Sequence, residues 1–294
     1  MRKLRRSIAA AALFLTVAAP GFAGIHYKAT TSTQDAASKT NQIQVESWVS
    51  GDSAKIVFLE SGGNPVAQEG TYILTKDGGR TLYLVNPEEK SYAKWDLQGM
   101  LGTMGAVMNG MGPLLKIQFS NVKVEKVSEG DGGTLLGLPT RNSKYRTSYT
   151  MTIKVLGMGN TSDVVTDQEV WSTTKLQDAG LGVWLRAEPP RTGNAEFDKL
   201  INADAYKLEG FPLKIVAVST QTSKKGKSQT TRSTMEVTQL DANAAVPATT
   251  FEIPKGYEET QILPSQGAEQ QGEGQQEEKG GLRGLLKPKK PPVE

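Results

Sequence analysis

The clearest folding signal in this sequence is the run Thr71-Tyr72-Ile73-Leu74-Thr75-Lys76-Asp77-Gly78-Gly79-Arg80-Thr81-Leu82-Tyr83-Leu84-Val85. Period-two alternation on both sides of a Gly-rich centre predicts two antiparallel strands joined by a tight turn. A turn at Asp77-Gly78 or at Gly78-Gly79 gives pairs of the same parity, so one face carries Tyr72, Leu74, Tyr83 and Val85. The other face carries Ile73, Leu82 and Leu84. Apolar residues on both faces predict that the protein covers this hairpin on both sides.

The same alternation predicts further strands before and after the hairpin. They cover residues 43–49, 54–59, 91–95, 122–125, 151–155, 169–171, 213–218 and 235–237. One short amphipathic helix is expected over residues 194–208, with Phe197, Leu200, Ile201 and Leu208 on its apolar side. Helix is therefore the minor structure, and residues 24–264 are expected to form one mainly β domain, a barrel or a sandwich.

The first residues predict an export signal. Residues 1–6 are basic, residues 8–19 are apolar except for Thr16, and small residues end this region at Ala23. This is the pattern of a secretory signal peptide, and the apolar run is too short to favour a membrane anchor. Cleavage near Ala23 would remove residues 1–23. Because the chain has no Cys to acylate, the product is expected to be periplasmic or secreted and not a lipoprotein.

Composition excludes several kinds of chemistry. The chain contains no Cys and a single His, His26, so disulfides, thiol nucleophiles and thiolate metal sites are impossible. His26 lies next to the predicted new N-terminus and is expected to be frayed and solvated. Glu169 with Asp167 is the one acid/base pair considered, but spacing alone does not bring two carboxylates together. We therefore predict no catalytic residue, no metal and no cofactor.

The charge distribution gives no sign of a nucleic-acid partner. The formal net charge of +3 comes from Arg2, Lys3, Arg5 and Arg6, and the rest of the chain holds 30 basic and 31 acidic residues. The basic run 224–227 is expected to be an exposed hairpin turn, because charge runs without interleaved aromatic residues are most often solvated. The Gly-rich run 130–133 lacks the residues of a phosphate loop and is expected to be a turn.

Residues 97–115 are rich in Met and Gly. Met100, Met104, Met108 and Met111 fall on one side of a helix. Glycine weakens such a helix, so it must be held by packing or be mobile. Two interpretations stay open: a lid over an apolar cavity, which suits the adaptable Met side chain, or a plug that fills the core.

Residues 265–294 differ in character from the rest. They consist largely of Gln, Glu and Gly and end in a Lys- and Pro-rich segment. Such a composition cannot bury enough apolar surface to fold, so a disordered tail is expected. Its interleaved Leu and basic residues allow at most a peripheral membrane contact.

Several stretches resemble a known bacterial family. They are the signal peptide, residues 70–87, Ser148-Tyr149-Thr150-Met151, the strand of Trp171 and the closing run Phe251-Glu252-Ile253-Pro254-Lys255-Gly256-Tyr257. They resemble an uncharacterised exported family that is similar to the LolA, LppX and RseB group of periplasmic proteins. The resemblance implies an unclosed antiparallel β-barrel, with a few helices on its concave face and an apolar cavity for acyl chains. It implies no catalytic residue.

The leading hypothesis is a non-enzymatic carrier or binding protein whose cavity encloses acyl chains, a lipid or an acylated protein. The expected apolar contacts are Met100, Leu101, Met104, Met108, Met111, Tyr72, Leu74, Tyr83 and Trp95. The alternative is an envelope interaction or sensor module whose interior is filled by its own side chains. An enzyme is a third and weaker hypothesis, because converging carboxylates leave no mark in a sequence. The sequence makes no prediction of oligomeric state.

Overall fold

The structure is a computed structural model that describes residues 22–63, 68–96, 98–99, 101–102, 115–176, 191–206 and 209–260. The chain divides into two compact units, residues 1–260 and 261–294, and all the described residues belong to the first. Most of the predicted signal segment, the predicted tail, and Met100, Met104, Met108 and Met111 lie outside the described residues.

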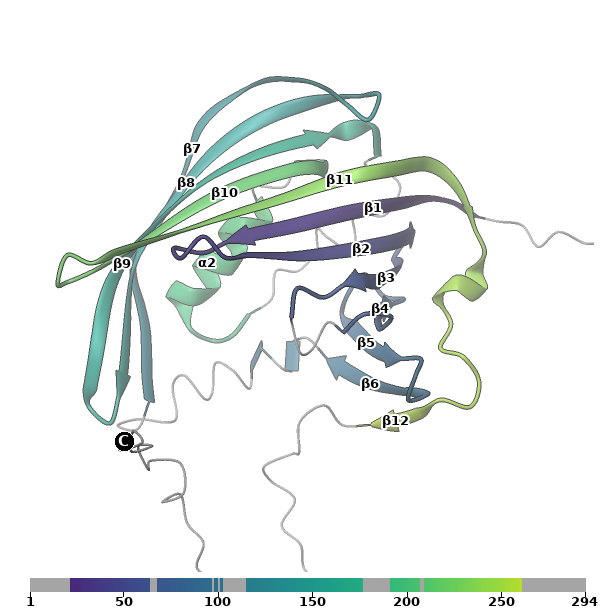
Figure 1. Ribbon diagram of the computed structural model, residues 1–294, viewed down its shortest axis with the longest axis horizontal. Helices are drawn as coiled ribbons and strands as arrows, with labels where there is room; N and C mark the ends of the chain where they lie inside the picture. The colour runs from purple at the N-terminus through teal and green to yellow at the C-terminus, as the bar shows by residue number, and fades with distance from the viewer. Residues whose placement is uncertain are drawn as a thin grey trace, which may run out of the picture. The chain divides into compact units, whose positions relative to one another are not determined.

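The described unit is built on one open sheet of twelve strands (Figure 1). The N-terminal strands, each paired with the next, are β1 (Phe22–Gln34), β2 (Thr40–Ser50), β3 (Ser53–Glu60), β4 (Tyr72–Thr75), β5 (Thr81–Asn86) and β6 (Ser91–Asp96). A second meander contains β7 (Leu115–Leu135), β8 (Leu138–Val155), β9 (Met158–Thr173), β10 (Phe211–Ser223) and β11 (Ser228–Val246).

Antiparallel pairing of β1 with β11 joins the two meanders into one sheet. β12 (Glu258–Thr260) adds to β6 in parallel and forms one edge, while β7 forms the other. The two edges do not pair, so the prediction of a mainly β, unclosed barrel is confirmed. Because β6 and β7 belong to opposite ends of the strand order, the chain from Asp96 to Leu115 connects the two ends of the sheet.

The predicted hairpin forms, and its strand faces are as predicted. Tyr72 pairs with Val85 and Leu74 with Tyr83. Gly78 and Gly79 both adopt positive φ, at 68° and 81°, which glycine tolerates without a steric penalty. Asp77 anchors the turn: its carboxylate accepts a hydrogen bond from the Thr81 N–H at 2.9 Å and one from the Thr75 hydroxyl at 3.0 Å.

These hydrogen bonds predict a pH-dependent stabilisation by Asp77. Partial burial alone would raise the pKa of Asp77, but the hydrogen bonds from Thr81 and Thr75 outweigh it and hold the pKa below its ordinary value. A depressed pKa stabilises the fold above the unfolded-state pKa and loses that effect as the pH falls through the folded-state pKa. We expect Asp77→Ala to lower the free energy of unfolding by about 1–2 kcal/mol at neutral pH.

Urea denaturation of both proteins over the acidic range checks this prediction. The difference between them should shrink as the pH falls below about 3.9, the ordinary pKa of Asp. Glu69→Ala removes an exposed carboxylate from the turn before β4 and serves as the control. A pH-independent difference at Asp77 would contradict the proposed role of its charge.

The two faces of the sheet are covered differently, and we name them by their neighbours. The inner face carries Ile73 and Phe119 and packs against helix α2 (Ala195–Tyr206). The outer face carries Tyr72 and Leu74. A buried cluster covers the outer face at the predicted hairpin, and η3 (Ala248–Phe251) contributes to it. Its members are Tyr72, Leu74, Val85, Ala244, Val246 and Phe251, with Ile253 and Tyr257 packed against them. Cover on this side of the hairpin is as expected.

A second buried cluster lies mainly on the inner face, near the start of β1. It contains Ile25, Tyr27, Ala29, Val49, Ala54, Leu176, Phe211, Leu213 and Val237. Leu176 comes from the short helix η1 (Thr174–Leu176), and the Tyr27 and Phe211 rings meet edge to face with centroids 5.3 Å apart. This cluster fixes the junction between the two meanders, because it takes side chains from both.

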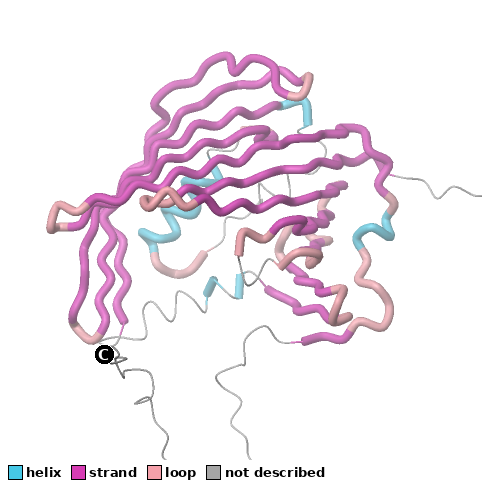
Figure 2. Tube along the Cα trace, in the orientation of Figure 1, coloured by secondary structure: helices cyan, strands magenta, loops and turns pink. Residues whose placement is uncertain are grey.

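Helix α2 lies close to its predicted bounds of 194–208, and Figure 2 shows it as the longest helix in the described chain. Asn194 caps it, since its side-chain oxygen accepts a hydrogen bond from the Phe197 N–H at 3.1 Å. The Phe197 ring stacks on Phe119 of β7 with centroids 4.9 Å apart. Because α2 belongs to the loop between β9 and β10, this contact holds the loop against the inner face.

Three sequence expectations are corrected by the structure. His26 is not frayed: it lies in β1, stacks on Trp48 and contacts the Glu46 carboxylate at 2.9 Å, because β1 pairs with strands on both sides. The run 130–133 lies within β7, and the chain turns later, at Leu136-Gly137. The strands from β7 to β11 are much longer than predicted, because polar segments such as 143–148 of β8 pair as fully as apolar ones, and because strand residues such as Phe119 and Val164 lie outside the predicted ranges.

Candidate functional site

A row of apolar side chains crosses the inner face from β3 to β6. Strand pairing aligns Ile56 with Ile73, Ile73 with Leu84, and Leu84 with Ala93. Leu82 and Trp95 form a second pair on the same face. We call Ile56, Ile73, Leu82, Leu84 and Trp95 the inner strip. All five are partly exposed, and none belongs to either buried cluster.

A pocket of about 320 Å³ opens elsewhere on the sheet, at the end of β1 and the start of β2. Its walls come from two strands and from the loop after β3, and its lining is Thr31, Thr33, Asn41, Ile43, Ser61, Gly62 and Gly63. Most of the lining surface is apolar, and the hydroxyl groups of Thr31, Thr33 and Ser61 and the amide of Asn41 supply its polar part. The pocket is thus suited to a small polar group that carries an apolar extension.

The inner face becomes richer in hydroxyl groups beyond β11. Ser143, Thr147 and Ser162 are buried there, and the Thr166 hydroxyl donates a hydrogen bond to the Ser219 hydroxyl at 3.0 Å. The sequence predicts an apolar cavity, and the described inner face combines apolar side chains with these hydroxyl groups. This division fits an amphiphilic ligand better than a simple hydrocarbon.

The structure separates the predicted contact residues. Trp95 lies on the inner strip, whereas Tyr72, Leu74 and Tyr83 face outward, where Leu74 is 0 % exposed. Leu101 lies in helical backbone and is partly exposed. Burial, and then the nearby Tyr257, raise the pKa of Tyr72 to about 12, which keeps its hydroxyl neutral. These outward residues form the core beneath η3, and their contact with a ligand stays a prediction.

Sequence reasoning missed Ile56, Ile73, Leu82 and Leu84 as candidate contacts. The alternation put Ile73, Leu82 and Leu84 together on one face of the hairpin, opposite Tyr72 and Leu74, and this is what the structure shows. Nothing in the hairpin itself says which face looks toward α2. That choice depends on the segment after β11, which is distant in sequence.

The carboxylates considered for catalysis are held separately by basic residues. Asp167 receives two hydrogen bonds from Arg146, at 2.7 and 3.0 Å, and the hydrogen-bonded guanidinium lowers the pKa of Asp167. Glu169 lies 3.1 Å from the Lys144 ammonium. Both acids sit on the outer face and are partly exposed. They form surface ion pairs, so the structure does not bring them together as an acid and a base.

Asp198 also has a structural partner. It accepts hydrogen bonds from the Thr192 N–H and hydroxyl at 2.6 and 2.7 Å. Desolvation alone would raise the pKa of Asp198, but these hydrogen bonds outweigh it and hold the pKa below its ordinary value. In the part of the chain that the structure describes, no group of three or more His, Asp or Glu side chains is placed to hold a metal ion.

Two hydrogen bonds join Gln98, just after β6, to Arg191, just before α2. The Gln98 amide donates to the Arg191 carbonyl at 2.7 Å and accepts from the Arg191 N–H at 3.2 Å. The paired hydrogen bonds hold the start of the Met- and Gly-rich stretch next to the loop that carries α2.

None of the helices in the described ranges combines the length and apolar character that crossing a bilayer requires.

Comparison with known proteins gives a family of unknown function and a set of distant structural likenesses. A LolA superfamily protein from Nitrosomonas europaea is 10 % identical, with a TM-score of 0.29, over 79 % of this chain and 91 % of that one. An uncharacterized conserved protein from Thermus thermophilus is 9 % identical, with a TM-score of 0.31, over 80 % and 90 %. No curated protein matches. Residues 158–257 match the family described as a domain of unknown function (DUF4412).

Proposed function

We propose that this protein is a non-catalytic carrier or binding protein for an amphiphile with an acyl chain, such as a lipid or an acylated protein. The observation that carries the proposal is the inner strip. Partly exposed apolar residues aligned across four strands offer a continuous surface to a hydrocarbon chain. Burial of apolar area contributes roughly 25 cal/mol per Å², so an extended chain lying on this surface would be held without any specific polar contact.

The polar part of the inner face supports an amphiphile as the ligand. The pocket at Thr31, Thr33 and Asn41 and the partly exposed hydroxyl groups of Thr166 and Ser219 can accept or donate hydrogen bonds to a headgroup or an ester. Met100, Met104, Met108 and Met111 belong to the connection between the two ends of the sheet. We include them in the proposal as adaptable apolar contacts, on the strength of their sequence pattern.

The proposed location is the periplasm or the outside of the cell. It rests on the predicted signal at residues 1–23 and on the absence of Cys from the sequence. The surface ion pairs of Asp167 and Glu169, and the structural roles of Asp77 and Asp198, leave the carboxylates described above with partners of their own. This supports a binding role over a catalytic one.

A substitution on the inner strip tests the proposal. We expect Leu84→Gln to weaken binding of a fluorescent long-chain fatty acid about tenfold, because burial of one Leu side chain contributes about 1.5–3 kcal/mol. The measurement is a fluorescence titration of protein purified after expression of the full chain. Lys94→Gln alters the outer face of the neighbouring strand β6 and is the matched control.

Two results would count against the proposal. Absence of probe binding by the wild-type protein would favour the alternative of an interaction or sensor module. Equal loss in Leu84→Gln and Lys94→Gln would show that the effect does not come from the inner strip. Urea denaturation of both variants separates loss of binding from loss of folding, since a folded variant keeps a cooperative transition.

A further inference from the structure

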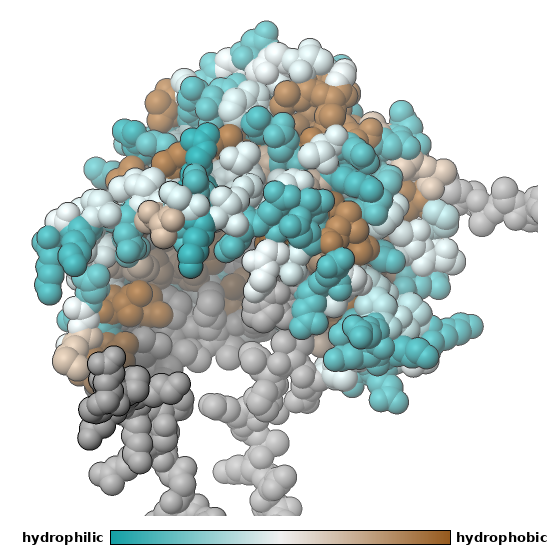
Figure 3. Space-filling view, viewed as in Figure 1, coloured by the Kyte–Doolittle hydropathy of each residue, from teal (hydrophilic) through white to brown (hydrophobic). Residues whose placement is uncertain are grey.

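The hairpin between β8 and β9 ends in exposed apolar side chains. We call Ile153, Val155, Leu156 and Met158 the apolar tip; Leu156 is 65 % exposed and Met158 77 % exposed. Val155 pairs with Met158 and also with Leu115 of β7, so the tip is the end of a three-stranded extension. Figure 3 shows hydrophobic side chains at the lower left, where this hairpin ends. Exposed apolar clusters of this kind mark contact surfaces.

The backbone of this turn gives a second reason to look for a function. Leu156 and Gly157 adopt φ of 51° and 79°, the positive values of a two-residue hairpin turn. Asn or Gly is the usual residue at the first position, because a larger side chain is disfavoured at positive φ. Leu156 therefore opposes the turn conformation and gains no burial in return. Neither turn formation nor core packing accounts for a leucine at this place.

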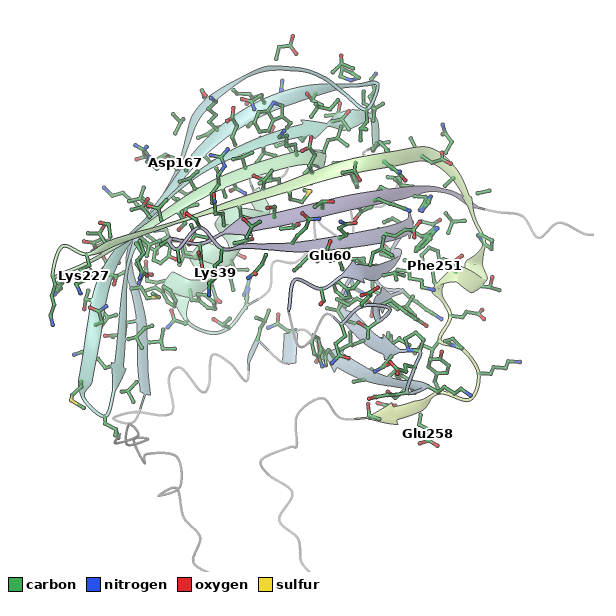
Figure 4. The ribbon with its side chains drawn as sticks, viewed as in Figure 1. Lys39, Glu60, Asp167, Lys227, Phe251 and Glu258 are labelled. Carbon is green, nitrogen blue, oxygen red and sulfur yellow. The ribbon has the colours of Figure 1, made fainter. Side chains whose placement is uncertain are left out.

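The charge around the tip is positive. Lys154 adjoins the turn, and Lys224, Lys225 and Lys227 lie in the neighbouring turn between β10 and β11. The Lys224 N–H donates a hydrogen bond to the Thr161 carbonyl at 3.2 Å. This turn therefore lies beside Thr161, which follows Met158 by three residues along β9. Figure 4 labels Lys227 at the end of that hairpin. Residues 151–162 and 224–231 contain no acidic residue, and the nearest acid on β9 is Asp163, which accepts a hydrogen bond from the Thr150 hydroxyl at 2.7 Å.

We propose that the apolar tip inserts into the interfacial region of an anionic phospholipid membrane. The tip supplies the buried apolar area, and the lysines of the two turns contact lipid phosphates. Each part is weak alone, and peripheral membrane binding depends on the combination of apolar burial with attraction to anionic lipids. The proposal goes beyond carriage of an acyl ligand and does not depend on it, because the tip can bind a bilayer whether or not the inner strip holds cargo.

The chain offers a matched pair of substitutions for the test. Leu136 occupies the same position in the turn between β7 and β8, with φ of 50° before Gly137 at 77°, and is 44 % exposed. Asp131 lies five residues before Leu136, nearer along the chain than any acidic residue of the β8–β9 hairpin lies to Leu156. Asn suits the first position of both turns. Leu156→Asn and Leu136→Asn should therefore both fold, and only the first removes an apolar group from the proposed membrane contact.

The experiment is co-sedimentation with phosphatidylcholine vesicles that contain or lack phosphatidylglycerol, using protein purified after expression of the full chain. We expect binding to the anionic vesicles, reduced about tenfold by Leu156→Asn and by Met158→Asn and unchanged by Leu136→Asn. Lys224→Gln combined with Lys225→Gln and Lys227→Gln should weaken binding further at low salt and reduce its salt dependence.

Three results would overturn the proposal. They are no binding of the wild-type protein to anionic vesicles, equal binding by Leu156→Asn and wild type, and equal losses in Leu156→Asn and Leu136→Asn. Sedimentation velocity without lipid tests whether the apolar tip instead contacts a second copy of the chain. If Leu156→Asn dissociates an oligomer but leaves vesicle binding intact, the tip is a contact between copies of the chain and not a membrane anchor.

Discussion

Replacing Leu74 with alanine is expected to lower the free energy of unfolding by about 3–5 kcal/mol, the upper range for a fully buried leucine. Leu74 is completely buried on the outer face, among Val246 and Phe251. Both of these residues come from the end of the domain, far from Leu74 in sequence. The cavity left by alanine would therefore weaken the attachment of η3 to the sheet, and collapse of the surrounding strands would fill only part of it.

Leu84→Ala is the matched control, because it removes the same atoms from the other face of the same hairpin. Leu84 is partly exposed on the inner strip, so its loss should lower stability by clearly less. Urea denaturation at one pH gives both values. Equal destabilisation by the two substitutions would mean that Leu84 contributes to packing as much as the buried residues of the outer cluster do. It would weaken the proposal that the strip binds a ligand.

Gly210→Ala is expected to be the most damaging change outside the core clusters. Gly210 has φ of +88°, and a Cβ atom there would lie 2.6 Å from the Thr173 carbonyl oxygen. The positive φ alone costs about 1–2 kcal/mol for a residue other than glycine. The contact is with backbone, which cannot rotate away, so we expect a total loss of about 3 kcal/mol or more.

Gly226→Ala separates these two contributions. Gly226 has φ of +77° in the turn after β10, and no atom lies within 4 Å of its added Cβ. This variant should show only the conformational part of the destabilisation. Thermal and urea denaturation of the two variants measure the difference. If Gly210→Ala is no worse than Gly226→Ala, the close approach of Gly210 to β9 does not contribute, and the start of β10 at Phe211 is not positioned by it.

Local chemistry was enough to predict the hairpin and the faces of its strands, because alternation and the turn within residues 76–80 act over fifteen residues. The choice between the two possible turns, and so the pairing of Tyr72 with Val85, came from the structure. Helix α2 was predicted within two residues of its bounds, since its apolar spacing and the cap at Asn194 are local. The length of β7 to β11 was not predicted: Ser- and Thr-rich segments continue β8 and β10, and apolar residues outside the predicted ranges, such as Phe119 and Val164, also belong to strands.

The candidate site shows the same division. The sequence grouped Ile73, Leu82 and Leu84 correctly on one face of the hairpin. Of the predicted ligand contacts, Trp95 lies on that same inner face, whereas Tyr72, Leu74 and Tyr83 lie on the outer face, and their contact with a ligand stays a prediction. Residues 247–257 cover the outer face, and a segment about 170 positions away leaves no trace in the alternation of the hairpin itself.

By itself, the sequence determined the secondary-structure class, the two faces of the hairpin, the charge balance and the chemistry that lack of Cys excludes, because each depends on neighbouring residues or on simple counts. Tertiary structure alone decided that β1 pairs with β11, that Ile73 and Leu84 face α2, and that the turn at 224–227 lies beside Thr161 of β9. These outcomes depend on contacts between residues remote in sequence, whose energies no local pattern contains.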